Sequence, residues 1–373
     1  MNLTPTAFGT WSGGRFMHYG EMLEEGRYRD LIRLAYEAGI RTFVTADVYG
    51  AGRADAALGE ALAGLERESY CLVGMVGHDF EKGAREGSKG YPRFTHPDLR
   101  GPRDYASYLR EASEKSLERC RAAKFDLVML HNPDEIGYTH EAVWEGMESV
   151  REGGLTEGIG IAPGPANGFV TDLIHCFRTF GSRIDGAMLI LNPLEPWPQR
   201  HVLPVAEERK IDVLTRVVDY GGIFHGDVRP GHVFKGGDHR GYRPEGWVET
   251  GSEKLERMRR VVGHYGLPAL HLAGLWNLGM PAVKSLVPTF IQETGESARP
   301  IEDKIREFAA LPEGLRFTPE EMRKIEEIGE NAGCMALKGA STRYQGPQER
   351  ADQWPMREEL LTIAQDHALD PSW

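Results

Sequence analysis

The sequence is poor in cysteine, and its cysteines do not combine into a recognisable site. Only four occur in 373 residues, at positions 71, 120, 176 and 334. No two of them form a C-x-x-C pair, so neither a zinc site nor a disulfide framework is indicated. This usage is typical of a reducing compartment. The first ten residues lack the basic and apolar regions of a signal peptide, so a cytoplasmic protein is expected.

An excess of positive charge and long apolar runs are also absent. The net charge of -12 argues against a nucleic-acid-binding surface. No apolar run approaches the roughly 18 residues of a membrane span, so no membrane contact is expected. Histidines and aspartates gather in two Gly-rich segments, but their spacing matches no metal-ligand pattern. We therefore expect solvated loop residues and no metal site at His78, Asp79, His225, Asp227, His232, Asp238 and His239.

What is present is an alternation of short apolar runs with amphipathic segments of helical length, the pattern of a parallel α/β fold. Eight runs that predict strands are Ala7–Trp11, Thr42–Ala46, Cys71–Val76, Leu127–Leu130, Gly158–Ala162, Ala187–Leu191, Val213–Val218 and Val283–Val287. The segments that predict helices are Arg29–Ala38, Ala54–Leu65, Tyr105–Ala122, His140–Glu152, Val170–Phe180, Val202–Lys210, Glu253–Gly263 and Ile301–Leu311. Eight such pairs predict a (β/α)₈ TIM barrel, and residues 1–373 are expected to form a single domain.

Three features depart from a minimal barrel. Long connections follow the third and seventh strands, Gly77–Arg103 and Asp219–Ser252. Loops of this length are usually lids or binding loops, and both leave the strand ends where barrel enzymes place their chemistry. An extra C-terminal helix is predicted over Pro319–Glu330, because Thr318 and Glu321 have the spacing of a capping box. The polar tail after about residue 339 is expected to wrap the barrel or to be poorly ordered.

Several motifs in order along the chain resemble the aldo-keto reductases. AGIRTFVTADVYGAGRADAALGEAL (residues 38–62) is similar to the segment in which a strand ends in Asp and Tyr before a helix with an L-G-x-A-L pattern. FDLVMLHNPDE (residues 125–135) is similar to the fourth strand, which ends in the active-site His. FGTWSGG, GLTEGIGIAPG, MLILNPLEP and VLTRVVDYGGIFHGD resemble the first, fifth, sixth and seventh strands. HNPDE and the loop after the third strand are similar to the sugar-dehydrogenase branch.

The resemblance implies an oxidoreductase that transfers hydride between NADP or NAD and a carbonyl or sugar-like small molecule. It places the proton donor at Tyr49, the substrate-orienting His at His131 and the catalytic Asp at Asp47. The family's lysine, which lowers the pKa of the tyrosine, is replaced by Met75. Without that lysine a buried Asp47 needs another partner. Arg216, His78 and a substrate hydroxyl are the candidates.

The resemblance also implies a cofactor site, although several of its positions depart from the family pattern. The residues that it assigns to cofactor binding are Thr10, Trp11, Arg216, Gly221, Gly222, Phe224 and Arg299. Gly221 and Gly222 are expected to offer backbone N–H groups to phosphate, and Arg299 with Lys304 to meet a 2′-phosphate. The positions that anchor the nicotinamide carboxamide are Ala162, Pro163 and Met188, and none of these has a side-chain donor.

These departures leave alternatives open. A fold does not determine a reaction, so a cofactor-independent lyase, isomerase or hydrolase could use Asp47, Tyr49 and His131 for acid–base chemistry on a sugar-like or keto substrate. A third class is a non-catalytic binding subunit descended from a reductase. The choice between NAD and NADP, the identity of the substrate and a homo-oligomeric state also stay open.

Overall fold

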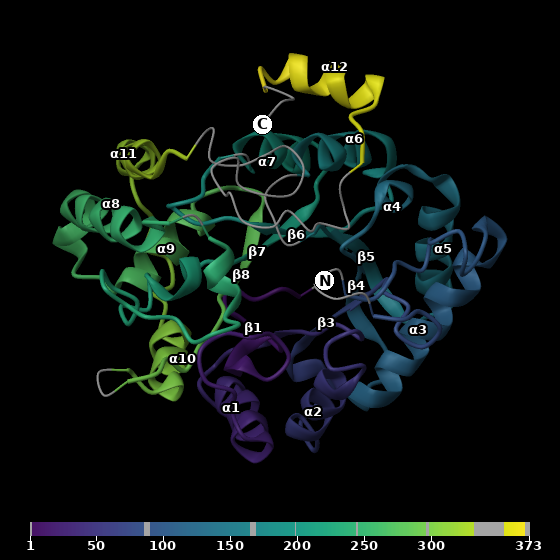
Figure 1. Cartoon of the computed structure of the whole chain (residues 1–373), viewed down its shortest axis with the longest axis horizontal. Coiled ribbons are helices and arrows are strands. Elements are labelled where there is room, and N and C mark those ends of the chain that lie inside the picture. Colours follow the sequence, from purple (N-terminus) through teal and green to yellow (C-terminus); the bar gives the residue numbers. More distant parts are fainter. Residues whose placement is uncertain are drawn as a thin grey trace.

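The computed structural model describes residues 2–85, 90–164, 169–197, 199–243, 245–295, 298–331 and 354–369. Eight parallel strands pair in sequence order from β1 to β8. The ring closes where Thr6 bridges to Leu286, whose N–H donates to the Pro5 carbonyl at 2.9 Å. Figure 1 shows the strands as a ring with the helices outside it. The predicted (β/α)₈ barrel is therefore confirmed.

The strands are short and mostly buried on both faces, as expected for a parallel sheet covered by helices. Their bounds are β1 (Ala7–Gly9), β2 (Thr42–Val44), β3 (Cys71–Val76), β4 (Phe125–His131), β5 (Thr156–Ala162), β6 (Gly186–Ile190), β7 (Asp212–Arg216) and β8 (Val283–Val287). Side chains that point into the ring form an apolar cluster, which includes Val44, Met75, Met129 and Met188. A larger cluster fills the space between sheet and helices.

Helices occupy every segment that the sequence predicts as helical. They are α1 (Glu25–Glu37), α2 (Arg53–Ala61), α3 (Tyr105–Cys120), α5 (Glu141–Glu152), α6 (Val170–Phe180), α7 (Gln199–Glu208), α8 (Trp247–Val262), α10 (Ile301–Ala309) and α11 (Pro319–Gly329). Thr318 and Glu321 form the predicted capping box. Short 3₁₀ helices lie at η1 (Ser12–Gly14), η2 (Arg67–Ser69), η4 (Pro102–Asp104), η5 (Tyr220–Gly222), η6 (His239–Tyr242) and η7 (Gly263–Tyr265).

The sequence did not predict α4 (Glu135–Thr139), α9 (Ala269–Leu278) or α12 (Glu358–Asp366). Nine of the ten residues of α9 are buried, so this helix has no polar face to give an amphipathic period. The loop after β7 is shorter than predicted, because α8 begins at Trp247 with Gly246 in a left-handed conformation before it. Of the tail, α12 lies along α6 (Figure 1), and residues 340–353 lie outside the described ranges. Among the described helices, none combines the length and hydrophobicity that crossing a bilayer requires.

A buried amide links α9 to the sheet. Asn277 is fully buried, and its Nδ2 donates to the Leu191 carbonyl and to Thr215 Oγ1, both at 2.9 Å. Buried polar groups are costly when they lack a partner. These two bonds therefore hold α9 against the ends of β6 and β7, whose following residues reach the barrel mouth.

We predict that Asn277→Ala lowers the free energy of unfolding by about 2–3 kcal/mol, because it leaves a small void and two acceptors without a donor. Urea unfolding monitored by circular dichroism measures this change. Arg260→Ala on the exposed face of α8 is the control and should cost less than about 0.5 kcal/mol. Equal stability of the two variants would contradict the role assigned to Asn277.

Candidate active site

Tyr49 and His131 meet at the rim of the barrel formed by the C-terminal ends of the strands. His131 is the last residue of β4, and Tyr49 lies in the turn after β2. Their rings pack edge to face with centroids 5.5 Å apart. Trp11, which follows β1, packs its ring 6.3 Å from that of Tyr49. The structure thus brings together two of the three residues predicted to be catalytic, at the face where barrel enzymes react.

The phenol of Tyr49 is held in its protonated form. Burial raises its pKa above the ordinary value of 10.0, and the nearby Arg216 guanidinium only partly opposes this shift. A phenol with a raised pKa keeps its proton throughout the neutral range. Tyr49 is therefore suited to donate a proton to an oxygen that gains negative charge.

The imidazole of His131 is neutral at pH 7. Burial lowers its pKa well below 6.5, and His78, Arg216 and Arg93 act in the same direction. His131 is 2% exposed, and its Nδ1 has no hydrogen-bond partner in the described part of the chain. A neutral imidazole has one donor and one acceptor nitrogen, so His131 can donate a hydrogen bond to a substrate oxygen.

His78 and Asn132, which were not among the residues predicted to be catalytic, support His131. His78 was expected to be a solvated loop residue, but it is buried, and its ring lies 5.2 Å from that of His131. His78 Nδ1 is 3.0 Å from the Tyr91 carbonyl, which can only accept, so the proton sits on Nδ1. His78 Nε2 then accepts from Asn132 Nδ2 at 3.3 Å. Burial lowers the pKa of His78 to about 3, so this contact adds no charge.

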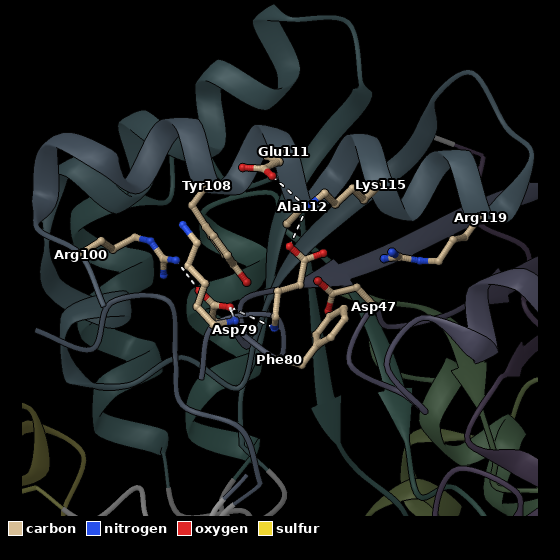
Figure 2. A pocket seen from close by; sticks show the side chains of 11 residues that line it. Asp47, Asp79, Phe80, Arg100, Tyr108, Glu111, Ala112, Lys115 and Arg119 are labelled. Atoms are coloured by element: carbon tan, nitrogen blue, oxygen red, sulfur yellow. Dashed lines mark hydrogen bonds and ion pairs between the residues drawn. The ribbon is translucent and has the colours of Figure 1, made fainter. Parts of the chain in front are cut away.

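Asp47 does not join Tyr49 and His131. Its carboxylate lines a cavity of about 30 Å³ together with side chains of α3, including Tyr108 and Arg119 (Figure 2). Oδ1 is buried without a hydrogen-bond partner, and Arg216 and His78 form their hydrogen bonds with other residues. Burial raises the pKa of Asp47 well above 3.8, and the neighbouring Asp55 adds to the rise.

The alternation of side chains along an extended chain explains this direction. Val44 and Ala46 point into the barrel, whereas Thr45 bonds to Asp55 of α2 on the outside. Asp47 continues the outward series. The N–H of Tyr49 then bonds back to the Ala46 carbonyl at 3.0 Å, and this turn returns the Tyr49 ring to the rim.

Met75 makes the barrel interior apolar at the position where the resemblance implies a lysine. It is fully buried and belongs to the inner cluster with Val44 and Ala46. Hence no ammonium group lies beside Tyr49 from this strand. The nearest positive charge that acts on the phenol is that of Arg216.

Arg216, the last residue of β7, crosses the mouth to the segment after β5. Its Nη2 donates to the carbonyls of Pro163 at 2.9 Å and Gly164 at 2.5 Å. Its Nε is buried without a partner. The guanidinium thus stands within electrostatic range of both Tyr49 and His131.

The positions expected to anchor a nicotinamide do not provide the donors that the carboxamide requires. Ala162 and Met188 are fully buried and apolar, and the Pro163 carbonyl already accepts from Arg216. Thr10 bonds to Thr45, and Trp11 Nε1 donates to Thr289, both at 3.1 Å. In the part of the chain that the structure describes, the polar groups of Thr10, Trp11 and Pro163 therefore form hydrogen bonds within the protein.

The loop expected to bind phosphate uses the amides of Gly222 and Phe224 internally. The N–H groups of Gly222 and Phe224 donate to the backbone carbonyl of Asp219 at 3.1 Å. The buried Asp219 carboxylate accepts from Gly222 and Thr289 N–H groups as well. Gly221 is in a left-handed conformation, and a side chain there would meet Trp247. An internal carboxylate thus occupies amides that a phosphate would use.

The basic residues expected at a 2′-phosphate are paired internally. Arg299 forms an ion pair with Glu307 at 2.8 Å and donates to the His225 carbonyl. Lys304 is fully buried and pairs with Asp227 at 2.6 Å. The described residues at the nicotinamide, at the phosphate loop and at the 2′-phosphate therefore do not fit the dinucleotide contacts that the resemblance implies. In the same described ranges, no group of three His, Cys, Asp or Glu residues could hold a metal ion.

Comparisons of the sequence and the structure with known proteins agree on one family. A family model described as "Aldo/keto reductase family" matches residues 6–330. The uncharacterized oxidoreductase YqkF of Bacillus subtilis (strain 168) is 24% identical over 308 residues, which are 81% of this chain and 88% of that protein.

Two solved structures share the fold. The glycerol dehydrogenase AKR11B4 from Gluconobacter oxydans has a TM-score of 0.68 and 21% identity, and the match covers 88% of this chain and 92% of that one. An aldo/keto reductase from Klebsiella pneumoniae in complex with NADP and acetate has a TM-score of 0.58 and 17% identity, with 95% and 96% covered.

We predict that Met75→Lys destabilises the protein by about 3–5 kcal/mol at pH 7, because a buried ammonium would find only apolar neighbours. Its pKa in the folded state would fall below the value of about 10.4 in the unfolded chain. The destabilisation is therefore full at pH values below the folded pKa, and it shrinks as the pH rises from there towards about 10. Urea unfolding at two pH values measures it, with Met75→Leu as a control costing less than about 1.5 kcal/mol. A small cost, independent of pH, would show that the lysine finds a partner.

Proposed function

Because the chain belongs to the aldo/keto reductase family, we propose that it is an oxidoreductase of this type, acting on a carbonyl or sugar-like small molecule at the barrel mouth. The contact between Tyr49 and His131 at the rim is the observation that carries this proposal. The match to a protein named as an oxidoreductase supports it. The cysteine usage and the acidic composition support a cytoplasmic location without nucleic-acid or membrane partners.

In this proposal Tyr49 and His131 handle the substrate oxygen. His131, neutral and fixed by its neighbours, donates a hydrogen bond that orients the carbonyl. Tyr49 donates its proton to the same oxygen as the carbonyl carbon is reduced. Burial keeps the phenol protonated before the reaction, and the Arg216 guanidinium opposes the rise in its pKa, which assists the donation because donation leaves a phenolate. Asp47 has no role in either step, because it faces α3.

NADP or NAD is the cofactor that the family supports, and the Klebsiella pneumoniae protein is a member in complex with NADP. When bound, such a cofactor supplies or receives the hydride. The described residues at its expected contacts do not fit it, since Arg299 and Lys304 are paired and the Gly222 amide is used internally. The proposal therefore assigns only the proton and the oxygen contacts to this chain.

A second candidate, which needs no such fit, is a cofactor-independent lyase, isomerase or hydrolase for a sugar-like or keto compound. Tyr49 and His131 would then act as an acid–base pair alone. The two candidates differ in one measurable property, which is the need for a nicotinamide.

We predict that Tyr49→Phe lowers kcat for NADPH- or NADH-dependent carbonyl reduction by about 10²–10⁴-fold, because the proton donor is lost while the ring still packs on His131 and Trp11. Nicotinamide fluorescence should show unchanged cofactor binding in this variant. Tyr265→Phe on η7, far from the rim in sequence and fold, is the matched control and should retain full activity. Turnover of a ketose or keto-glycoside without any nicotinamide would instead establish the second candidate.

A further inference from the structure

The guanidinium of Arg216 has hydrogen-bonding capacity that the described residues do not use. Nη2 is fixed by the carbonyls of Pro163 and Gly164, which lie after β5 on the far side of the mouth. Nε is buried and has no partner, and Nη1 forms no hydrogen bond within the described ranges. The side chain is therefore held in place by one nitrogen, while two others are available to a ligand.

No carboxylate of the described chain neutralises this charge. The groups that interact with Arg216 are the side chains of Tyr49, Tyr19 and Tyr138, together with the neutral His131. Burial raises the pKa of Tyr49 and of Tyr19, so both are uncharged phenols at neutral pH.

The two acidic residues that could have approached are engaged elsewhere. Asp47 faces α3, and Asp219 is buried and accepts the amides of Gly222 and Thr289. A half-buried charge without a counter-ion is unfavourable for the protein alone. It becomes favourable when a ligand brings the opposite charge.

Two other arginines, Arg243 and Arg240, do have carboxylate partners. Arg243 pairs with Glu195 at 3.2 Å, and Arg240 forms ion pairs with Asp238 and Glu293. Arg216 thus stands apart from these two guanidinium groups, since each of them has a carboxylate partner within the protein.

We propose that Arg216 forms an anion subsite, which selects substrates that carry a carboxylate beside the carbonyl bound by Tyr49 and His131. The class is a sugar acid or a keto acid. A single guanidinium matches one negative charge. Arg216 binds the carbonyl of Pro163, which directly follows Ala162, the residue paired with His131, so a carboxylate at Arg216 would lie close to the reacting oxygen. This inference deepens the proposed function and rests on the same site.

Calorimetric titration of the full chain with matched ligand pairs tests the subsite. The pairs are 2-keto-D-gluconate with its amide and pyruvate with pyruvamide, so that only the charge differs. We expect at least one acid to bind about 10-fold or more tightly than its amide. That preference should weaken as NaCl is added.

Arg216→Met should reduce this preference to less than about twofold, while amide binding stays within about twofold of the wild type, and Arg216→Lys should retain part of it. Arg41→Met is the matched control, because Arg41 also donates to backbone carbonyls but lies just before β2, at the opposite end of the barrel. Should Arg216→Met fail to fold, the salt dependence of the wild type and the Arg216→Lys variant still decide the question.

Several outcomes overturn the inference. They are an equal affinity for acid and amide in every pair, or a preference that survives in Arg216→Met. Loss of nicotinamide binding in Arg216→Met with the acid preference intact would assign Arg216 to the cofactor instead. The titration needs no turnover, so a preference for acids without nicotinamide-dependent reduction would count against the proposed function alone. Reduction of neutral carbonyls with no such preference would count against the subsite alone.

Discussion

The contact between Tyr49 and His131 is the interaction on which the account of the site depends. It exists because the parallel strands β2 and β4 end at one rim of a closed barrel, so that residues 82 positions apart in sequence pack edge to face. The turn from Ala46 to Tyr49 returns the phenol to this rim after the chain has left the barrel wall. His78 and Asn132 then fix the surroundings of His131 without adding charge.

Neutrality is the second property of the site. The barrel interior below the pair is apolar, with Met75 and Val44 in its cluster, and burial keeps the phenol protonated and the imidazole uncharged. Arg216 therefore has a strong influence, since low-dielectric surroundings strengthen a charge for which the described residues supply no carboxylate partner. A site of this kind holds the phenol protonated and the imidazole neutral before a substrate binds.

The fold could be predicted from the sequence because it depends on a repeated pattern. All eight strands were identified, and the capping box at Thr318 gave the start of α11 to the residue. α9 was missed because burial on all sides removes the amphipathic period, and α12 was missed because it follows a long polar segment.

The site was predicted less completely, since it depends on side-chain direction. Tyr49 and His131 were located by motif, but Asp47 was assigned to the same site although it points outward. Ala46 points into the barrel and Thr45 bonds to Asp55 outside it, so Asp47 falls on the outer side. The alternation of side chains that begins in β2 could have indicated this direction. The position of His78 beside His131 could not be found in this way, because residue 78 already lies in the loop after β3, where the alternation of strand side chains ends. The pairing of Arg299 and Lys304 likewise depends on contacts between distant segments.

A crystal structure of the chain with a bound keto sugar acid, such as 2-keto-D-gluconate, tests the central claim most directly. The account predicts a ligand carbonyl or hydroxyl oxygen within about 3 Å of both the Tyr49 phenol oxygen and a His131 ring nitrogen. A ligand bound elsewhere, or one that leaves both side chains in contact only with each other, would contradict it.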